Sequence, residues 1–154
     1  MNKLLDEPLS LDLAAQIKSK AKTPFENAYK AALVTEGATY VQGFLAMASQ
    51  PYQPIEHGWL EQGDRIIDPS LPHLAKNPQE LYYFPAQRLT VKQLKAAIEE
   101  AKEDYPEDNP LPIYGASPYE YYGDVMLGGK DYLDAHQAAT AQCQELVQRH
   151  AEQN

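Results

Sequence analysis

Two short apolar segments joined by a tight turn constrain the fold of this chain more than any other feature of its sequence. His57 lies near the start of the first segment, Asp68 closes the second, and Gly63-Asp64 lies between them. A Gly-Asp pair between two apolar runs is typical of a β-hairpin, because glycine supplies the positive φ that such turns need. The sequence therefore predicts antiparallel strands over residues 55–61 and 65–68, with His57 and Asp68 side by side near the open end.

The predicted pair of His57 and Asp68 has a chemical and a structural interpretation. An aspartate beside a histidine fixes the imidazole tautomer and supports its charged form, which is the orienting half of a nucleophilic triad. Alternatively, Asp68 begins a turn before Pro69 and accepts local backbone donors, while His57 is a buried core residue. Trp59, two positions after the histidine, is either a core residue or a platform for a ligand.

Four motifs follow one another in this part of the chain. They fall within residues 23–71 and read Phe25-Glu26-Asn27-Ala28-Tyr29, Tyr40-Val41-Gln42-Gly43-Phe44, Glu56-His57-Gly58-Trp59 and Ile67-Asp68-Pro69-Ser70. Their order and spacing resemble the papain-like transglutaminase superfamily, in particular small bacterial and phage proteins of that type. That family has a cysteine opening a helix, then Tyr-Val-x-Gly, His-Ala-Trp and Ile-Asp-Pro-Thr. The resemblance covers under half of the chain and implies a transglutaminase-like (papain-like) core with His57 and Asp68 as site residues.

One position departs from the family pattern. The resemblance puts Pro24 where the family's cysteine would open the helix, and proline has no nucleophilic atom. A thiol at a helix N-terminus has its pKa lowered by the helix dipole, which is why such enzymes place it there. Thr23 and Glu26 instead form the pattern of a capping box, with Pro24 at the first helical position. The resemblance therefore implies a pseudoenzyme in which His57 and Asp68 are a remnant pair.

Two other residues are candidates to replace the missing nucleophile. Thr23 is adjacent, but its hydroxyl is expected to cap the helix and so to bond a backbone donor. Cys143 is the only cysteine, and it lies roughly 10 Å along a predicted helix from His136, too far for a nucleophile and its base. We expect Cys143 to be a small hydrophobe of the core. A single thiol forms no internal disulfide, which suits a reducing cytoplasm.

The composition argues against several classes of protein. A net charge of −9 argues against ordinary nucleic-acid binding, which needs lysine and arginine to displace counterions. We recognise no signal peptide and no apolar run long enough to span a membrane, and we expect a cytoplasmic protein. No spacing suggests a zinc site or a phosphate-binding glycine loop, so we expect no metal and no cofactor. The acidic run over residues 99–108 is expected to be a solvated helix face; the alternative is a surface that engages a basic partner.

A segment rich in tyrosine, glycine and proline, over residues 106–129, is predicted to be an irregular loop. Its candidate binding residues are Tyr114, Tyr119, Tyr121 and Tyr122. Tyrosine offers a large contact area at little cost in rotamer entropy, together with a polar tip, and interface loops use these properties. The alternative is a loop that wraps its own domain with the tyrosines packed inward.

The remaining patterns predict one α+β domain over residues 1–154, with helices packed on a small antiparallel sheet. Thr90 and Gln93 form a second capping-box pattern, and the aromatic run over residues 82–84 is expected in the core. Apolar periodicity and helix-end signals predict helices over residues 9–21, 24–34, 91–105 and 130–151, and a further strand over residues 39–48.

Two functions from different classes agree with these patterns. The first is a non-catalytic binding or regulatory protein on a degenerate transglutaminase-like scaffold, engaging a protein partner or a small ligand; an inhibitor of phage or bacterial type would suit the size and charge. The alternative is a cysteine-independent amide hydrolase or acyl-transferase with His57 as base, Asp68 as orienter, and Thr23 or a water as nucleophile. Pro24 favours binding over catalysis.

Overall fold

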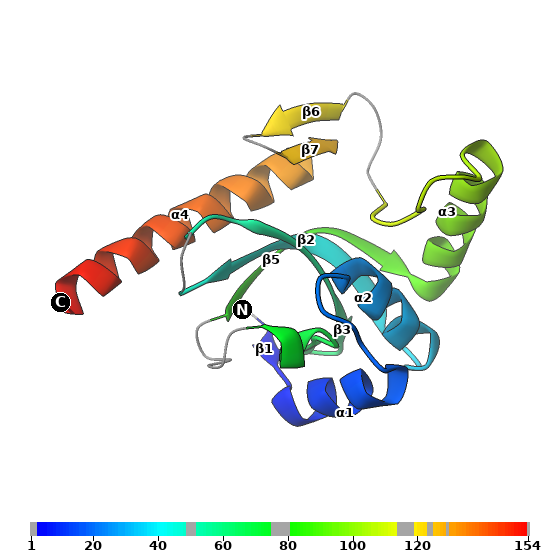
Figure 1. Ribbon diagram of the computed structural model, residues 1–154, viewed down its shortest axis with the longest axis horizontal. Coiled ribbons are helices and arrows are strands. Elements are labelled where there is room, and N and C mark those ends of the chain that lie inside the picture. Colours follow the sequence, from blue (N-terminus) through cyan, green and yellow to red (C-terminus); the bar gives the residue numbers. More distant parts are fainter. Residues whose placement is uncertain are drawn as a thin grey trace. The chain divides into compact units, whose positions relative to one another are not determined.

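The computed structural model describes residues 3–48, 52–74, 81–113, 119–122, 125–128 and 130–153 (Figure 1). In that part of the chain the α-helices are α1 (Glu7–Ile17), α2 (Pro24–Leu33), α3 (Val91–Asp104) and α4 (Lys130–Gln153), with one 3-10 helix, η1 (Leu71–His73). The strands are β1 (Leu4–Leu5), β2 (Thr39–Met47), β3 (Ile55–Gln62), β4 (Arg65–Ile67), β5 (Leu81–Thr90), β6 (Tyr119–Tyr122) and β7 (Val125–Gly128).

A five-stranded sheet in the order β1-β4-β3-β2-β5 forms the framework of the fold. The predicted hairpin is confirmed, since β3 and β4 are antiparallel with Gln62 opposite Arg65, and Gly63 has a φ of +60°. The expectation of a purely antiparallel sheet is wrong, because the N-terminal β1 pairs in parallel with β4. The α+β class is confirmed, with a mixed sheet.

The chain divides into two compact units. The first comprises residues 1–42, 58–74 and 88–113, and the second comprises residues 43–57, 75–87 and 114–154. Strands β2, β3 and β5 each contribute residues to both. In the first unit α1 packs against α2, η1 and β4, and Figure 1 shows α1 and α2, drawn in shades of blue.

The core of the first unit forms between the helices and one face of β2, β3 and β4. Alanines line the inner side of α2, so the helix backbone can approach the sheet closely. The buried residues of this cluster are Leu13, Ala28, Ala31, Ala32, Ala38, Tyr40, Leu60, Ile67, Leu94 and Ile98. Burying a leucine or isoleucine side chain contributes roughly 1.5–3 kcal/mol, so this cluster is the main source of stability in the unit.

The second unit has its own cluster around α4. Phe44 meets the ring of His136 edge to face, with ring centroids 5.1 Å apart, and Tyr132 donates to the side-chain oxygen of Gln87 at 2.5 Å. Burial lowers the pKa of His136, because the charged imidazolium would lose hydration there. The expectation that Cys143 is a core residue is confirmed, because its side chain is buried on α4.

Helix ends follow the local chemistry only in part. The capping box at Thr90 and Gln93 is confirmed, with both reciprocal hydrogen bonds present. Helix α1 starts at Glu7, because Asp6 caps it through the N–H of Leu9, and it ends before Lys18 at φ +57°. The predicted range 9–21 is therefore shifted at both ends.

Two further expectations were wrong. The aromatic run over residues 82–84 is only half-buried, although Phe84 packs against the cluster around Phe44, and the run belongs to β5, a strand that alternation did not reveal. The segment over residues 106–129 is not irregular throughout: β6 and β7 pair as an antiparallel hairpin with Tyr119 opposite Gly128. The proline and glycine content of the segment over residues 106–129 is typical of a loop, and it concealed two short strands that pair with each other. The pairing of β5 depends instead on β2, which is distant in sequence.

The buried amide of Asn27 fixes the connection between α1 and α2. Its Nδ2 donates to the carbonyl of Lys20 at 2.8 Å and to Ser70 Oγ at 2.9 Å, and its Oδ1 accepts from the N–H of Lys20 at 3.1 Å. The residue is 3 % exposed. One side chain therefore ties the loop before α2 to the segment that follows β4.

We expect Asn27→Ala to lower the free energy of unfolding by roughly 2–3 kcal/mol, because buried partners lose their hydrogen bonds. Glu26→Ala is the matched control. That neighbour is exposed and forms only a surface ion pair with Lys30 at 3.2 Å, so its loss costs about 0–0.5 kcal/mol. Chemical denaturation of both variants measures the difference, and equal losses would contradict a structural role for Asn27.

Candidate functional site

Gly58, on β3, is the residue that faces the start of α2. A Cβ built on Gly58 would lie 3.0 Å from Phe25 Cδ1, 3.3 Å from Phe25 Cα and 3.4 Å from the carbonyl oxygen of Pro24. Leu60, two positions along the strand, belongs to the same core as the alanines of α2. The even-numbered residues of β3 therefore face α2, and a side chain larger than that of glycine at residue 58 would press on the ring of Phe25 and on the first helical turn.

The side chains of His57 and Trp59 emerge from the opposite face of β3, because successive residues of a strand alternate between its two faces. Both are buried, at 2 % and 0 % exposure. The ring of His57 lies 6.3 Å from that of Tyr83, at a tilt of 47°. His57 and Trp59 thus share a face of β3, as their spacing of two residues requires.

Asp68 is fully buried at the end of β4 and orders the turn that follows. Its Oδ1 accepts from the N–H of Ser70 at 2.9 Å, and its own N–H donates to Ser10 Oγ at 2.9 Å. That hydroxyl in turn donates to the carbonyl of Asp6 at 2.6 Å. Asp68 therefore accepts a local backbone donor, as its structural interpretation predicts.

The register of the hairpin bears on the predicted pair. Leu60 lies opposite Ile67, so Trp59 is the residue of β3 that comes nearest in register to Asp68. His57 is two positions further along. A direct contact between His57 and Asp68 stays a prediction.

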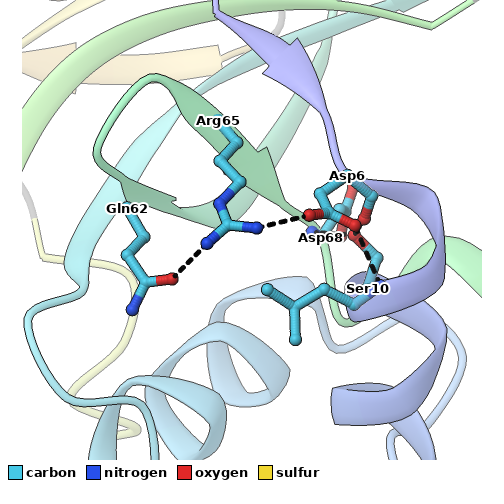
Figure 2. A network of polar contacts seen from close by, with 6 residues as sticks. Asp6, Ser10, Gln62, Arg65 and Asp68 are labelled. Carbon is cyan, nitrogen blue, oxygen red and sulfur yellow. Dashed lines mark hydrogen bonds and ion pairs between the residues drawn. The ribbon is translucent and has the colours of Figure 1, made fainter.

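Arg65 joins the turn of the hairpin to the start of α1 (Figure 2). Its Nη1 donates to Asp6 Oδ2 at 2.8 Å, and its Nη2 lies 3.5 Å from Gln62 Oε1. The pKa of Asp6 is lowered, first by the hydrogen bond from the N–H of Leu9 and then by Arg65. These contacts are exposed to solvent. They stabilise the edge of the sheet and do not form a reaction centre.

The candidate nucleophiles are engaged in structural contacts. The hydroxyl of Thr23 lies 3.3 Å from the carbonyl of Lys20 and 3.4 Å from Asn27 Oδ1, and it caps no backbone N–H. The predicted capping box at Thr23 and Glu26 is therefore wrong, because the buried amide of Asn27 competes for that hydroxyl. Burial raises the pKa of the Cys143 thiol, which keeps it protonated and unreactive.

A second buried carboxylate, Glu61, was not found from the sequence. It is held between two cations: Arg88 Nε lies 2.7 Å from Oε1 and Nη2 lies 3.3 Å from Oε2, while Lys3 Nζ lies 3.8 Å from Oε1. The same hydrogen bond raises the pKa of Arg88. Alternation places Glu61 on the face of β3 that carries Trp59. In the sequence it is an acid at the end of the strand predicted over residues 55–61, beside the turn, where a charged residue is ordinarily exposed.

The tyrosines proposed for binding are only partly described. Tyr114 lies outside the described residues, as do the side chains of Tyr119, Tyr121 and Tyr122. The backbone of the last three forms β6, which pairs with β7 from Tyr122 opposite Val125 to Tyr119 opposite Gly128. In unit two, β7 packs against α4.

Within the described residues, no group of three or more histidine, cysteine, aspartate or glutamate side chains could hold a metal ion. No helix in the same part of the chain is long and apolar enough to cross a membrane. No protein-family model, curated protein or solved structure matches the chain.

We expect Arg88→Met to lower the free energy of unfolding by roughly 1–3 kcal/mol, because a buried carboxylate loses its two-pronged partner. Arg149→Met is a close control. Arg88 and Arg149 are both 52 % exposed in their side chains, but Glu61 is 7 % exposed and Glu145, the partner of Arg149, is 51 % exposed. The control should therefore cost under about 1 kcal/mol.

A double-mutant cycle with Glu61→Gln tests whether the ion pair itself is responsible. The two substitutions should be non-additive by about 1 kcal/mol or more, because both remove one interaction. Full additivity in denaturant unfolding would show that Arg88 acts through packing alone.

Proposed function

We propose that this chain is a non-catalytic binding protein that engages a protein partner through the β6–β7 hairpin. The observation that carries the proposal is the hairpin itself: a segment with three tyrosines among four residues forms its own two-stranded sheet. Tyrosines on a paired backbone are a better contact surface than tyrosines on an irregular loop, since less conformational entropy is lost on binding.

The pairing of β6 supports a definite mode of contact. In the part of the chain that the structure describes, β6 pairs with β7 alone. The edge of such a strand presents alternate N–H and C=O groups, to which an extended segment of a partner can add as a further strand. Main-chain hydrogen bonds would then supply affinity, and the tyrosines would supply specificity.

The described residues support binding over catalysis. The hydroxyl of Thr23 is engaged with the loop before α2, and the thiol of Cys143 is buried with a raised pKa. Gly58, rather than His57, faces the first turn of α2. The imidazole of His57, on the opposite face of β3, would therefore not meet a nucleophile at the start of that helix.

A degenerate transglutaminase-like origin of the scaffold forms part of the proposal. It is supported by the chain order of a helix that begins at Pro24, followed by three strands that are neighbours in the sheet. On such a scaffold the acidic character would speed association with a basic partner and weaken with salt. An inhibitor or regulator of bacterial or phage type fits this description.

The binding test compares two changes of tyrosine. A double variant, Tyr119→Ser with Tyr121→Ser, should raise the Kd for a partner co-purified from a host lysate by about tenfold or more. Tyr105→Ser is the control, because Tyr105 is 67 % exposed but lies outside the hairpin. Calorimetric titration measures both, after thermal unfolding has shown that the variants fold. Equal affinity of the double variant and the unchanged chain would refute the role of the hairpin.

The catalytic alternative is tested by Pro24→Cys, which restores a thiol at the family's position. We expect this variant to react with an activated ester no faster than a free thiol does. The reason is that Gly58, and not His57, is the residue of β3 that faces the start of the helix. Turnover by this variant that disappears in combination with His57→Ala would restore the catalytic interpretation. Steady-state ester hydrolysis is the measurement.

A further inference from the structure

The loop between α1 and α2 carries a local excess of positive charge in an acidic protein. Lys18, Lys20 and Lys22 are all exposed, and none forms an ion pair with a residue that the structure describes. Five other cations are paired with carboxylates, namely Lys3, Lys30, Arg65, Arg88 and Arg149, whereas Lys92, Lys95, Lys102 and Lys130 likewise form no ion pair with a residue that the structure describes. In a protein with a net charge of −9, this loop is distinctive because three of its five residues from Lys18 to Lys22 are cations and none is an acid.

The backbone of this loop is held in place from both sides. The N–H of Ser19 donates to the carbonyl of Ala14 at 2.9 Å, which closes the end of α1. Asn27 bonds both the N–H and the carbonyl of Lys20. Lys18 and Lys22 have φ angles of +57° and +67°, in the left-handed region. The Cα atoms of Lys18 and Lys22 are at most about 14 Å apart, because four residues of chain separate them. This separation is short enough for the long lysine side chains to reach one small ligand.

A histidine and a serine add polar groups to the same loop. His73, on η1, places Nε2 at 3.1 Å from Ser19 Oγ and at 3.1 Å from the carbonyl of Ser19. These contacts join segments 54 residues apart in sequence, and they attach the imidazole to the middle of the lysine loop. The result is a hydroxyl, an imidazole and three ammonium groups on one preorganised turn.

The start of α2 contributes to the same region. Thr23 does not cap the helix with its side chain, and Pro24 stands at the first helical position. The first N–H groups of a helix carry partial positive charge and favour anions. This contribution adds to the lysines and is not needed to define the site.

We propose that the loop over residues 18–23, together with His73, binds a compact phosphate-type oxyanion. Lysine ammonium groups bind phosphate as point charges, and the hydroxyl of Ser19 can donate to its oxygens. His73 Nε2 donates to the carbonyl of Ser19 and so positions the loop. A long polyanion such as nucleic acid would be repelled by the remaining negative charge of the protein. The ligand class is therefore a small phosphate ester or polyphosphate. The site is independent of the β6–β7 hairpin.

Titration with inorganic pyrophosphate tests the proposal, with backbone amide chemical shifts as the readout. We expect saturable shifts at residues 18–25 and at His73. The triple variant K18Q/K20Q/K22Q should weaken the affinity by about tenfold or more. Its control, K92Q/K95Q/K102Q, makes the same change of charge on exposed positions of α3, and it should bind within about twofold of the unchanged protein.

Three results would overturn this site. They are shifts that rise without saturation, equal weakening in both triple variants, or binding only to vesicles of anionic lipid with no response to pyrophosphate. Ser19→Ala keeps the charge and removes the hydroxyl, so it should weaken binding by a smaller factor than the triple variant. Unchanged amide shifts outside the loop establish that each variant remains folded.

Discussion

The buried amide of Asn27 is the interaction on which the arrangement of the first unit depends. It bonds Lys20 twice and Ser70 once, so the loop before α2 and the turn after β4 are fixed by the same side chain. Buried polar networks of this kind are stable only when every member is satisfied. The start of α2, the turn at Asp68 and the lysine loop therefore keep their geometry together.

Alternation along a single strand decides what the candidate site can do. A shift of one residue moves every side chain of a strand to the other face, and in β3 the face toward α2 belongs to Gly58 and Leu60. His57, Trp59 and Glu61 share the remaining face. Both faces of β3 are buried, so the imidazole and the carboxylate belong to a packed interior whose polar members need partners, as Glu61 has in Arg88.

The distribution of charge separates two properties of the protein. The overall acidity is carried at exposed positions such as those of α3, where it affects solubility and the rate of association. The lysine loop has the opposite sign, and its backbone is held by hydrogen bonds to Asn27 and to the end of α1. A small charged ligand responds to the local field of such a loop, whereas a large partner responds to the whole surface. Both kinds of recognition can therefore coexist on one chain.

Local patterns in the sequence determined the hairpin around Gly63, the capping box at Thr90 and the burial of Cys143, because each depends on residues close together along the chain. The succession of these elements gave the α+β class. The β6–β7 hairpin is local, and it was missed because the proline- and glycine-rich composition around it is typical of a loop. Only the tertiary structure decided the parallel pairing of β1 and the place of β5 in the sheet, since their partners are distant in sequence. The same reason explains why Asn27 and Glu61 were not found: a buried amide or carboxylate is defined by the groups that surround it. The sequence alone pointed to His57 and Asp68 as candidate site residues. The direction of each side chain depends on tertiary structure, namely on the packing of α2 against Gly58 and on the hydrogen bond between Asp68 and the N–H of Ser70.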